Sequence, residues 1–301
     1  MGAGGVGGYF GGRLAAAGAD VTFLARGAHL EALRSRGLTL HSFRGDLHLP
    51  RVNASDDPRA IGPVDIVLFT VKLYDADAAA TRLPPLIGPN TAVIPLQNGV
   101  DGVDIVSRAV GRAHAAGGTV YVAAVLAEPG VIRHSALDHV IFGELDGAQS
   151  SRLQRLLDAC TPAGFQVTLT DNIHVDIWTK FVRLSVFSGM TAVTRCPIGR
   201  VVADPDLFEM LKSAARETMA VARAKGVAVP DHVIDDVDRA YRAFPPHMKS
   251  SMLEDLERGR RLELPWLSGA VVRIGREVGV PTPTHEFIAT VLKPHVNGSL
   301  G

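Results

Sequence analysis

The first residues of the chain contain a glycine pattern that can bind phosphate. Gly2, Gly4 and Gly7 form G-x-G-x-x-G and lead into a helical stretch over 6–17. In a dinucleotide-binding turn, the first glycine permits a tight turn, the second lets the backbone approach the pyrophosphate, and the third lets helix and strand pack closely. The helix start then directs its N–H groups at the phosphates. A chance cluster is the alternative, because the chain has 31 glycines, but the helix and strand patterns that follow favour a dinucleotide site.

The end of the next strand indicates which dinucleotide binds. NAD-binding turns are followed, about 20 residues further on, by an acidic side chain that binds the ribose hydroxyls. No Asp or Glu occurs over 21–30, and Arg26 stands at the strand end. A planar guanidinium pairs well with a 2′-phosphate, so we predict NADP(H). A solvated surface arginine is the other interpretation of Arg26.

Two further strand ends point to the same site. Lys72 follows the strand expected over 65–71, and Asn98 with Gly99 follows the strand expected over 91–97. Ligand-binding groups in open α/β sheets come from the carboxyl ends of the strands. Asn-Gly is also a common turn sequence, but the shared position favours a role in binding.

Lys180 is the ionisable residue whose neighbours best suggest proton transfer. It lies in a helical stretch among apolar residues that include Trp178, Val182 and Leu184. Apolar surroundings disfavour the charged form of lysine and lower its pKa, which suits a general acid. By the helix pattern alone, a lysine that keeps its ammonium group in water is the more common case.

A polar cluster further along the chain has two interpretations. Ser250, Ser251, Asp255 and Glu263 would offer hydroxyl and carboxylate contacts to a ligand, or form a helix cap and an exposed charged face. The periodicity does not choose between them.

The elements that must position these residues predict an α/β fold followed by a helical one. Short apolar strands are expected over 21–25, 65–71, 91–97 and 118–125. Their alternation with helices is typical of a doubly wound, Rossmann-type parallel sheet covered on both faces. A hairpin is expected over 39–50, and further strands with a turn are expected over 131–145 as an antiparallel continuation at the sheet edge.

From residue 173 the pattern becomes helical, and Pro and Gly residues mark the breaks. Helices are expected over 173–193, 205–225, 231–243, 250–258, 262–279 and 284–293. We therefore predict an NADP-binding domain over 1–170 and a helical substrate and catalytic domain over 171–301. The active site of such a pair is expected in the crevice between the domains.

Composition narrows the class of protein. The chain has 31 basic and 31 acidic residues, so it lacks the basic excess expected of a partner of nucleic acid or of an anionic membrane. Two separate cysteines, Cys160 and Cys196, indicate a reducing compartment. The first residues show no secretory signal, and no apolar run is long enough for a membrane helix. We expect a cytoplasmic protein without a metal site.

Together these residues resemble the ketopantoate reductase (2-dehydropantoate 2-reductase) family over essentially the whole chain. The similar segments are GAGGVGGYFGGRLAAAGADVTFLARG, T-x-K around Lys72, Q-N-G at 97–99, W-x-K at 178–180 and S-S-M-L-x-D at 250–255 with Glu263 beyond it. The resemblance implies NADPH-dependent reduction of 2-dehydropantoate to pantoate, in pantothenate and coenzyme A biosynthesis. It also implies a helical domain resembling that of 6-phosphogluconate dehydrogenase, and it allows a homodimer.

The resemblance implies a role for each matching residue. Lys180 would donate the proton to the keto oxygen, and Glu263 would lie on the nicotinamide side and orient Lys180. Asn98 would reach both cofactor and substrate, and Ser251 would bind the substrate. The remaining cofactor contacts implied are Gly2, Ala3, Gly4, Gly5, Val6, Gly7, Arg26, Lys72 and Ala124.

Three positions depart from the family pattern. The family usually has asparagines in the substrate site where this chain has Leu184, Ser188 and Ile198. A site with fewer hydrogen-bonding groups should bind a polyhydroxylated acid less well. A reductase of a more apolar 2-keto acid or ketone is therefore the alternative function.

Two other classes are less favoured. β-Hydroxyacid and 6-phosphogluconate dehydrogenases resemble the fold but carry their lysine in a different motif. An NADP-sensing module without turnover would have no need of Lys180 and Glu263.

The start of the chain is unusual for this fold. Family members carry a strand directly before the glycines, and this strand is central in the order 3-2-1-4-5-6. Here only Met1 precedes Gly2. We expect Met1 to match the end of that strand and the natural chain to start upstream. The sheet should then have a gap or a non-native pairing at its centre, and NADPH binding should be weakened.

Overall fold

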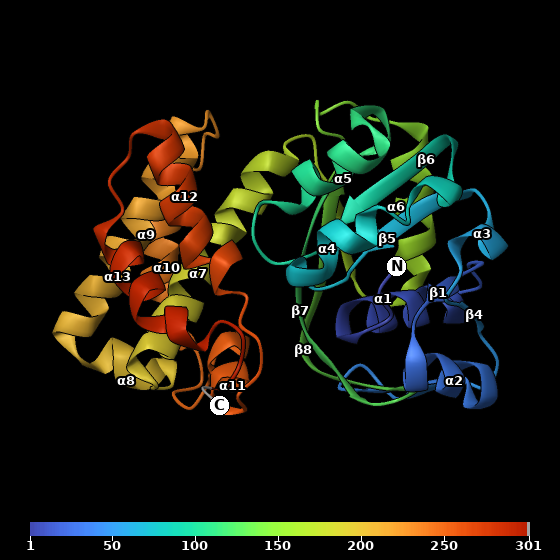
Figure 1. Ribbon diagram of the computed structural model, residues 1–301, viewed down its shortest axis with the longest axis horizontal. Helices are drawn as coiled ribbons and strands as arrows, with labels where there is room; N and C mark the ends of the chain where they lie inside the picture. The colour runs from blue at the N-terminus through green and yellow to red at the C-terminus, as the bar shows by residue number, and fades with distance from the viewer. Residues whose placement is uncertain (300–301) are drawn as a thin grey trace. The chain divides into compact units, whose positions relative to one another are not determined.

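The computed structural model describes residues 1–299, which fold into two compact units (Figure 1). Unit 1 comprises Met1–Gln97 and Asp101–Ile173. Unit 2 comprises Asn98–Val100 and the chain from His174 onward. The segment Asn98–Val100 therefore leaves unit 1 after a strand and packs with unit 2 before the chain returns.

Unit 1 is a mixed α/β fold with parallel strands, as the sequence predicts. Its helices are α1 (Gly5–Ala16), α2 (Gly27–Arg36), α3 (Pro58–Ile61), α4 (Leu73–Ala80), α5 (Gly102–Val110) and α6 (Ser151–Cys160). Its strands are β1 (Thr22–Leu24), β2 (Leu38–Ser42), β3 (Leu47–Leu49), β4 (Asn53–Ser55), β5 (Val64–Phe69), β6 (Ile87–Pro95), β7 (Gly117–Glu128), β8 (Val131–Gly143) and β9 (Gln166–Leu169).

Four strands of unit 1 form two parallel pairs, β1 with β4 and β5 with β6. Met1 and Gly2 lie between these pairs. The Gly2 N–H donates to Leu24 O at 3.1 Å, and the Thr70 N–H donates to Met1 O at 2.9 Å. Among residues 1–299 no strand joins β1 to β5, so the gap expected at the sheet centre is present.

The other sheet of unit 1 has five strands in the order β3-β2-β8-β7, with β9 paired to β8. β2 and β3 form the hairpin predicted over 39–50, and β7 and β8 form a long antiparallel pair. β7 was expected among the parallel strands. Instead, a bridge between Val93 and Ala115 links the chain to β6 just before β7 begins.

The strands predicted over 131–145 are antiparallel to their neighbour β7, as expected, but the prediction of a turn and of a place at the sheet edge is wrong. β8 is one strand, and it pairs with β2, β7 and β9. The residues expected to turn form a bulge, in which Leu137 has a φ of 57°. Two contacts hold this bulge: Arg44 Nε donates to the Asp138 carboxylate at 2.7 Å, and His134 Nε2 donates to Leu137 O.

Helix α1 anchors the glycine turn to the core of unit 1. Its residues Tyr9, Phe10 and Leu14 are buried. The ring of Phe10 meets the ring of Phe165 edge-on, with centroids 4.9 Å apart. Because the apolar face of α1 is buried, the turn that precedes it is held by a packed helix.

Unit 2 is helical, as predicted. Its helices are α7 (Ile173–Thr194), α8 (Ile198–Ala203), α9 (Pro205–Ala224), α10 (Val233–Ala243), α11 (Ser251–Glu257), α12 (Ser268–Val278) and α13 (Pro283–Leu292). α7 is the longest of them, with 22 residues. Its residues Val182, Val186 and Met190 recur at the spacing of one helix face and are fully buried in the core.

Two predicted boundaries in unit 2 are corrected. The helix expected over 262–279 begins only at Ser268, because Leu264–Trp266 forms a short 3-10 turn containing Pro265. The helix α8 was not predicted, because Pro197 was interpreted as a break. Proline is accepted at a helix start, and Pro197 is the N-cap residue of α8.

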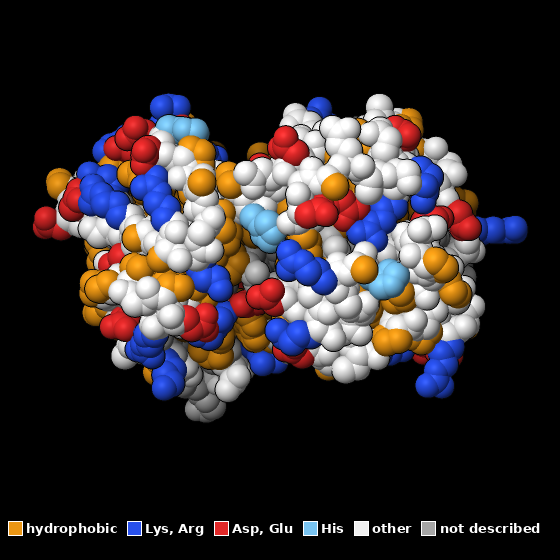
Figure 2. Space-filling model, turned by 90° about the horizontal axis from the view of Figure 1, so that it is seen from above, with side chains coloured by type: hydrophobic (Ala, Val, Ile, Leu, Met, Phe, Trp, Pro, Cys, Tyr) orange, Lys and Arg blue, Asp and Glu red, His pale blue; other side chains and the backbone are white. Residues whose placement is uncertain are grey.

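Within residues 1–299, every helix is too short or too polar to span a membrane. On the face drawn in Figure 2, basic and acidic side chains are interspersed. This distribution accords with the formal net charge of zero.

Candidate active site

The glycine turn has the geometry that pyrophosphate binding requires. Gly2 has a φ of 95°, and a Cβ on Gly7 would overlap Gly2 O and the Thr70 hydroxyl. A Cβ on Gly4 would meet no surrounding protein atom within 4 Å. Gly4 is the N-cap of α1, which has no side-chain cap and no acidic residue in its first turn. The turn is therefore tight on one side and open on the other, and its N–H groups fit an anion.

The other residues expected to contact a dinucleotide at this turn surround it. Ala3 is buried, and Val6 packs against the core of unit 1. A Cβ on Gly5 would overlap the Ala124 carbonyl. Ala124 thus borders the turn through its backbone, while its contact with a cofactor stays a prediction.

Thr70 positions the turn, although the sequence patterns gave it no role. Its hydroxyl lies 2.7 Å from Gly2 O and 3.0 Å from Met1 O. These contacts attach the end of β5 to the first residues of the turn. Thr70 is the threonine of the T-x-K motif, but only Lys72 of this motif was predicted to contact the cofactor.

Arg26 and Lys72 are the two cations expected to bind the cofactor from unit 1. Arg26 is the N-cap residue of α2, and Lys72 is the N-cap residue of α4. The Arg26 side chain is 75% exposed, and its Nη2 lies 3.9 Å from Asp75 Oδ2 on α4. The guanidinium that would bind a 2′-phosphate therefore has a carboxylate beside it.

Asp75→Asn is expected to tighten binding of NADPH about threefold and to leave binding of NADH unchanged. The carboxylate of Asp75 would repel a 2′-phosphate placed at Arg26, and an exposed charge contact of this kind contributes about 0.2–1 kcal/mol. Titration of both dinucleotides at low salt measures the effect. Asp77→Asn is the matched control, because Asp77 is exposed on the same helix and pairs with Arg108. Equal tightening by both variants would contradict the assignment.

Lys180 is buried in unit 2 and does not extend into water. Its side chain comes from α7 and is 9% exposed. Its Nζ donates to Asn98 Oδ1 at 3.1 Å. Burial lowers the pKa of Lys180 to about 8, and the Glu263 carboxylate acts in the opposite direction by raising it. The lysine thus has both the surroundings and the pKa of a general acid near neutral pH.

Asn98 and Glu263 converge on Lys180 from distant parts of the chain. Asn98 belongs to the segment that leaves β6 and packs with unit 2. Glu263 lies in the loop between α11 and α12, and it is 5% exposed. The structure therefore brings together Lys180, Asn98 and Glu263, three of the residues expected from the sequence.

The residues expected to bind substrate differ in how far they are exposed to solvent. Leu184 lies one helical turn after Lys180, is partly buried and packs against the core of unit 2. Ser188 is fully buried, and its hydroxyl has no hydrogen-bond partner among the described residues. Ser251 is exposed at the start of α11. Ile198 is fully buried in the same core. Substrate contacts of Leu184, Ser188 and Ser251 stay predictions.

Ser250, next to Ser251, has a structural role. Its hydroxyl accepts from the Leu253 N–H at 3.1 Å and lies 2.7 Å from the Thr191 hydroxyl on α7. It thereby caps α11 and attaches this helix to α7. Of the polar residues 250–263, Ser250 therefore serves as a helix cap. Glu263 is not part of an exposed charged face, because it is buried near Lys180.

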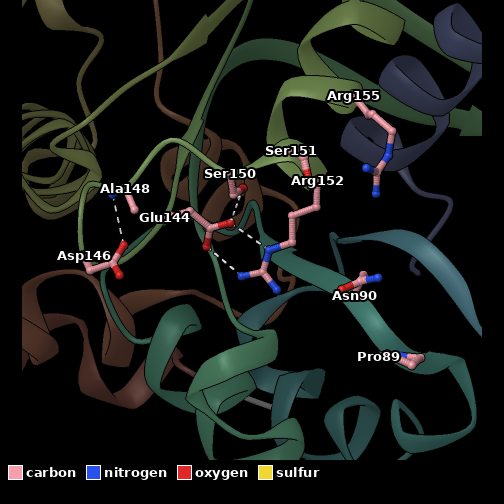
Figure 3. Close-up of a pocket in the computed structure, with 9 residues that line it drawn as sticks. All are labelled: Pro89, Asn90, Glu144, Asp146, Ala148, Ser150, Ser151, Arg152 and Arg155. Atoms are coloured by element: carbon pink, nitrogen blue, oxygen red, sulfur yellow. Dashed lines mark hydrogen bonds and ion pairs between the residues drawn. The ribbon is translucent and has the colours of Figure 1, made fainter.

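The hollow shown in Figure 3 involves none of these residues. It has a volume of about 410 Å³ and is lined by Pro89, Asn90, Glu144, Asp146, Ala148, Ser150, Ser151, Arg152 and Arg155. Arg152 donates to both oxygens of Glu144, at 2.7 and 2.6 Å. This ion pair is largely buried, which indicates a structural role for Glu144 and Arg152. Within residues 1–299 no cluster of three His, Cys, Asp or Glu residues could hold a metal ion.

Comparison with known proteins gives a consistent result. Residues 1–147 match the family model described as ketopantoate reductase PanE/ApbA, and residues 172–296 match its C-terminal counterpart. The 2-dehydropantoate 2-reductase of Mesorhizobium japonicum is 32% identical over 316 residues, which cover 97% of this chain and 95% of the relative. The enzyme of the same name from Archaeoglobus fulgidus is 30% identical and covers 97% of this chain and 95% of its own length.

Solved structures agree with these matches. A PanE/ApbA family ketopantoate reductase from Ralstonia eutropha has a TM-score of 0.90 at 33% identity, over 98% of this chain and 97% of that structure. A D-mandelate dehydrogenase complexed with NADH has a TM-score of 0.85 at 21% identity, over 97% of this chain and 96% of its own, and shares the fold. With family matches over both of its units, the chain belongs to the ketopantoate reductase family of oxidoreductases, which act on CH–OH groups.

Proposed function

We propose that this protein reduces the ketone of 2-dehydropantoate to pantoate with NADPH, in pantothenate and coenzyme A biosynthesis. The observation that carries the proposal is the buried Lys180, whose Nζ donates to Asn98 at 3.1 Å and whose pKa is lowered to about 8. A buried ammonium group of this kind is suited to a keto oxygen that gains negative charge. The cytoplasmic location and the homodimer stay predictions from the sequence.

The residues of unit 1 would hold the cofactor. The open side of Gly4 and the N–H groups of α1 would bind the pyrophosphate, and Arg26 would bind the 2′-phosphate. Lys72 and Ala124 complete the set of proposed contacts. NADPH, when bound, supplies the hydride that adds to the carbonyl carbon.

The residues of unit 2 would handle the proton. Lys180 Nζ would hydrogen-bond to the keto oxygen and transfer a proton to it as the carbon accepts hydride, which yields the neutral alcohol. Asn98 would keep the ammonium group oriented, and Glu263 would keep Lys180 protonated by raising its pKa. Ser251, exposed at the start of α11, would bind the substrate.

A more apolar 2-keto acid or ketone is the second candidate substrate. It is favoured by Leu184, which lies one helical turn after Lys180 where a hydrogen-bonding asparagine is usual in the family. A leucine cannot pair with a substrate hydroxyl, and a site built to bind such a hydroxyl discriminates strongly. An NADP-sensing module remains the least favoured alternative, because it would not need the pairing of Lys180 with Asn98.

Steady-state reduction of a panel of 2-keto acids separates these candidates. The panel pairs 2-dehydropantoate with its analogue that lacks the hydroxyl group, and adds branched and aromatic 2-keto acids. The highest kcat/KM with 2-dehydropantoate supports the proposal. A preference for the analogue would assign the apolar alternative, and binding of NADPH without turnover of any ketone would indicate the sensing module.

Ketone reduction is expected to slow as pH rises through about 8. The reaction needs protonated Lys180, and the lowered pKa means that the protonated form is present below about 8 and lost above it. A lysine with an ordinary pKa of about 10.4 would keep its proton to higher pH. The profile of kcat/KM against pH measures this decrease, which forms the alkaline limb of the profile.

Glu263→Gln should move this limb to lower pH. Removal of the carboxylate leaves burial as the main influence on Lys180, and burial lowers its pKa. Glu257→Gln is a matched control, because Glu257 pairs with Lys249 at 2.7 Å on the surface. A limb unchanged by Glu263→Gln, or moved to higher pH, would contradict the assigned role.

A further inference from the structure

A histidine outside the glycine motif is attached directly to the glycine turn. His29, on α2, has its Nε2 2.7 Å from Ala3 O, while the Gly130 N–H donates to its Nδ1 at 3.0 Å. A backbone N–H can only donate, so Nδ1 is the acceptor and Nε2 carries the ring proton. The turn between β7 and β8 therefore fixes the tautomer in which His29 donates to Ala3.

The bond from His29 determines how the peptide group before α1 is oriented. In a trans peptide, the carbonyl and the following N–H point in opposite directions. Because the Ala3 carbonyl points to His29, the Gly4 N–H points away from it. Gly4 is also the residue beside which the protein leaves open space. The histidine thus acts on the peptide group that a pyrophosphate would approach.

The remainder of α2 does not depend on this bond. Leu30 and Leu33 are buried and anchor the helix in the core of unit 1. Removal of the imidazole nitrogens therefore leaves α2 and the Arg26 at its start in place, while the Ala3 carbonyl loses its donor.

We propose that His29 is a positioning residue that holds the Ala3–Gly4 peptide in the orientation required to bind the pyrophosphate of a dinucleotide. The inference rests on the proposed function, because that function assigns the dinucleotide to this turn. It adds to the turn a residue outside G-x-G-x-x-G that acts through the backbone and has no contact with the ligand.

The same geometry makes dinucleotide affinity sensitive to acid. Burial lowers the pKa of His29, and the hydrogen bond to Ala3 acts in the opposite direction. Protonation would place a second N–H on Nδ1, facing the Gly130 N–H, so the neutral ring is the form that holds the turn. Affinity should therefore fall as pH drops below the usual histidine range of about 6.5. The charged groups on its helix and on the elements packed nearby are Arg26, Glu31, Arg34, Arg36, Asp56 and Glu128. Arg34 lies 3.8 Å from Glu31 and 3.5 Å from Asp56, and Arg36 Nη2 donates to Pro129 O at 3.1 Å.

Two substitutions test the proposal with the acid-stable NADP⁺ as probe. His29→Phe keeps a planar ring but has neither donor nor acceptor, whereas His29→Gln keeps one of each and does not titrate. His29→Phe is expected to raise the Kd of NADP⁺ about tenfold, as when a buried acceptor loses its donor. His29→Gln is expected to stay within about twofold of wild type. The Kd of 2′-AMP, which has no pyrophosphate, should be unchanged in both variants.

The pH profile gives the second readout. The phosphate of the probe also titrates near pH 6, but it does so equally in all variants. The ratio of wild-type to His29→Gln affinity should therefore fall as the pH is lowered, and this change isolates His29. An unchanged Kd of NADP⁺ in His29→Phe, or an equal weakening of 2′-AMP, would overturn the proposal. Failure of the wild type to bind NADP⁺ and NAD⁺ would instead overturn the proposed function, and this inference with it.

Discussion

Lys180→Met is expected to lower kcat for ketone reduction by about a thousandfold while the Kd of NADPH stays unchanged. Methionine fills a similar volume at this buried position of α7, but it has no proton to donate. The keto oxygen would then gain charge without a partner in a water-poor site. Pre-steady-state oxidation of NADPH measures the chemical step, and cofactor titration measures binding.

Controls separate proton donation from burial and charge. Lys225→Met removes an exposed lysine at the end of α9 and should leave kcat unchanged. Lys180→Arg keeps a cation near the buried Glu263, but a guanidinium does not give up its proton, so it should be nearly as slow as Lys180→Met. A kcat for Lys180→Met within about threefold of wild type would contradict the role of general acid.

Gly4→Val is expected to weaken NADPH binding about a hundredfold, equivalent to about 2.7 kcal/mol, without lowering Tm. A Cβ on Gly4 would meet no surrounding protein atom within 4 Å, and its φ of −71° is not in the region that favours glycine. The fold therefore tolerates valine, whereas a pyrophosphate loses its approach to the backbone. Calorimetric titration and thermal unfolding measure the two quantities on the same sample.

Gly7→Val is the contrasting variant. Its Cβ would overlap Gly2 O and the Thr70 hydroxyl, so it should lower Tm as well as affinity; overpacking of this kind typically costs about 1–3 kcal/mol. We therefore expect Gly4 to be needed for ligand binding and Gly7 to be needed for the packing of the fold as well. NADPH affinity equal to wild type in Gly4→Val would place the pyrophosphate elsewhere.

Local patterns predicted the glycine turn well, because its requirements lie within a few residues. Gly2, Gly4 and Gly7 show the strained φ, the open side and the close helix contact that the motif implies. Thr70 and His29 were not predicted to act on the turn. Their contacts with it span 68 and 26 residues of sequence, and no periodicity indicates such a contact.

The sequence did not decide whether the Lys180 side chain is buried or extends into water. Helix periodicity placed apolar residues around it but could not say what covers that face. The answer comes from Asn98, 82 residues away, and from Glu263. Residues distant in sequence determine whether a charged group is buried. The sequence could therefore predict only that the pKa of Lys180 would fall if the side chain were buried.

The errors in the fold have similar causes. The middle of β8 carries polar residues that suggest a turn, yet Asp138 and His134 are satisfied by Arg44 and by Leu137 O, so the strand continues through a bulge. Pro197 was interpreted only as a helix break, although it begins α8, and Pro265 was placed inside a predicted helix, although it lies in a 3-10 turn. A proline indicates a helix boundary, but it does not show whether the helix ends before it or begins at it.

Transfer of hydride from NADPH to 2-dehydropantoate, with Lys180 as the proton donor, is the reaction that we propose for this chain. A single-turnover experiment with the enzyme in excess over NADPH tests it directly, with pantoate and oxidised cofactor quantified from the same samples. We expect one pantoate to form for each NADPH oxidised by the wild type, and we expect Lys180→Met to bind the cofactor but to form almost no pantoate. NADPH that is bound by the wild type and remains reduced in the presence of saturating 2-dehydropantoate would contradict the account.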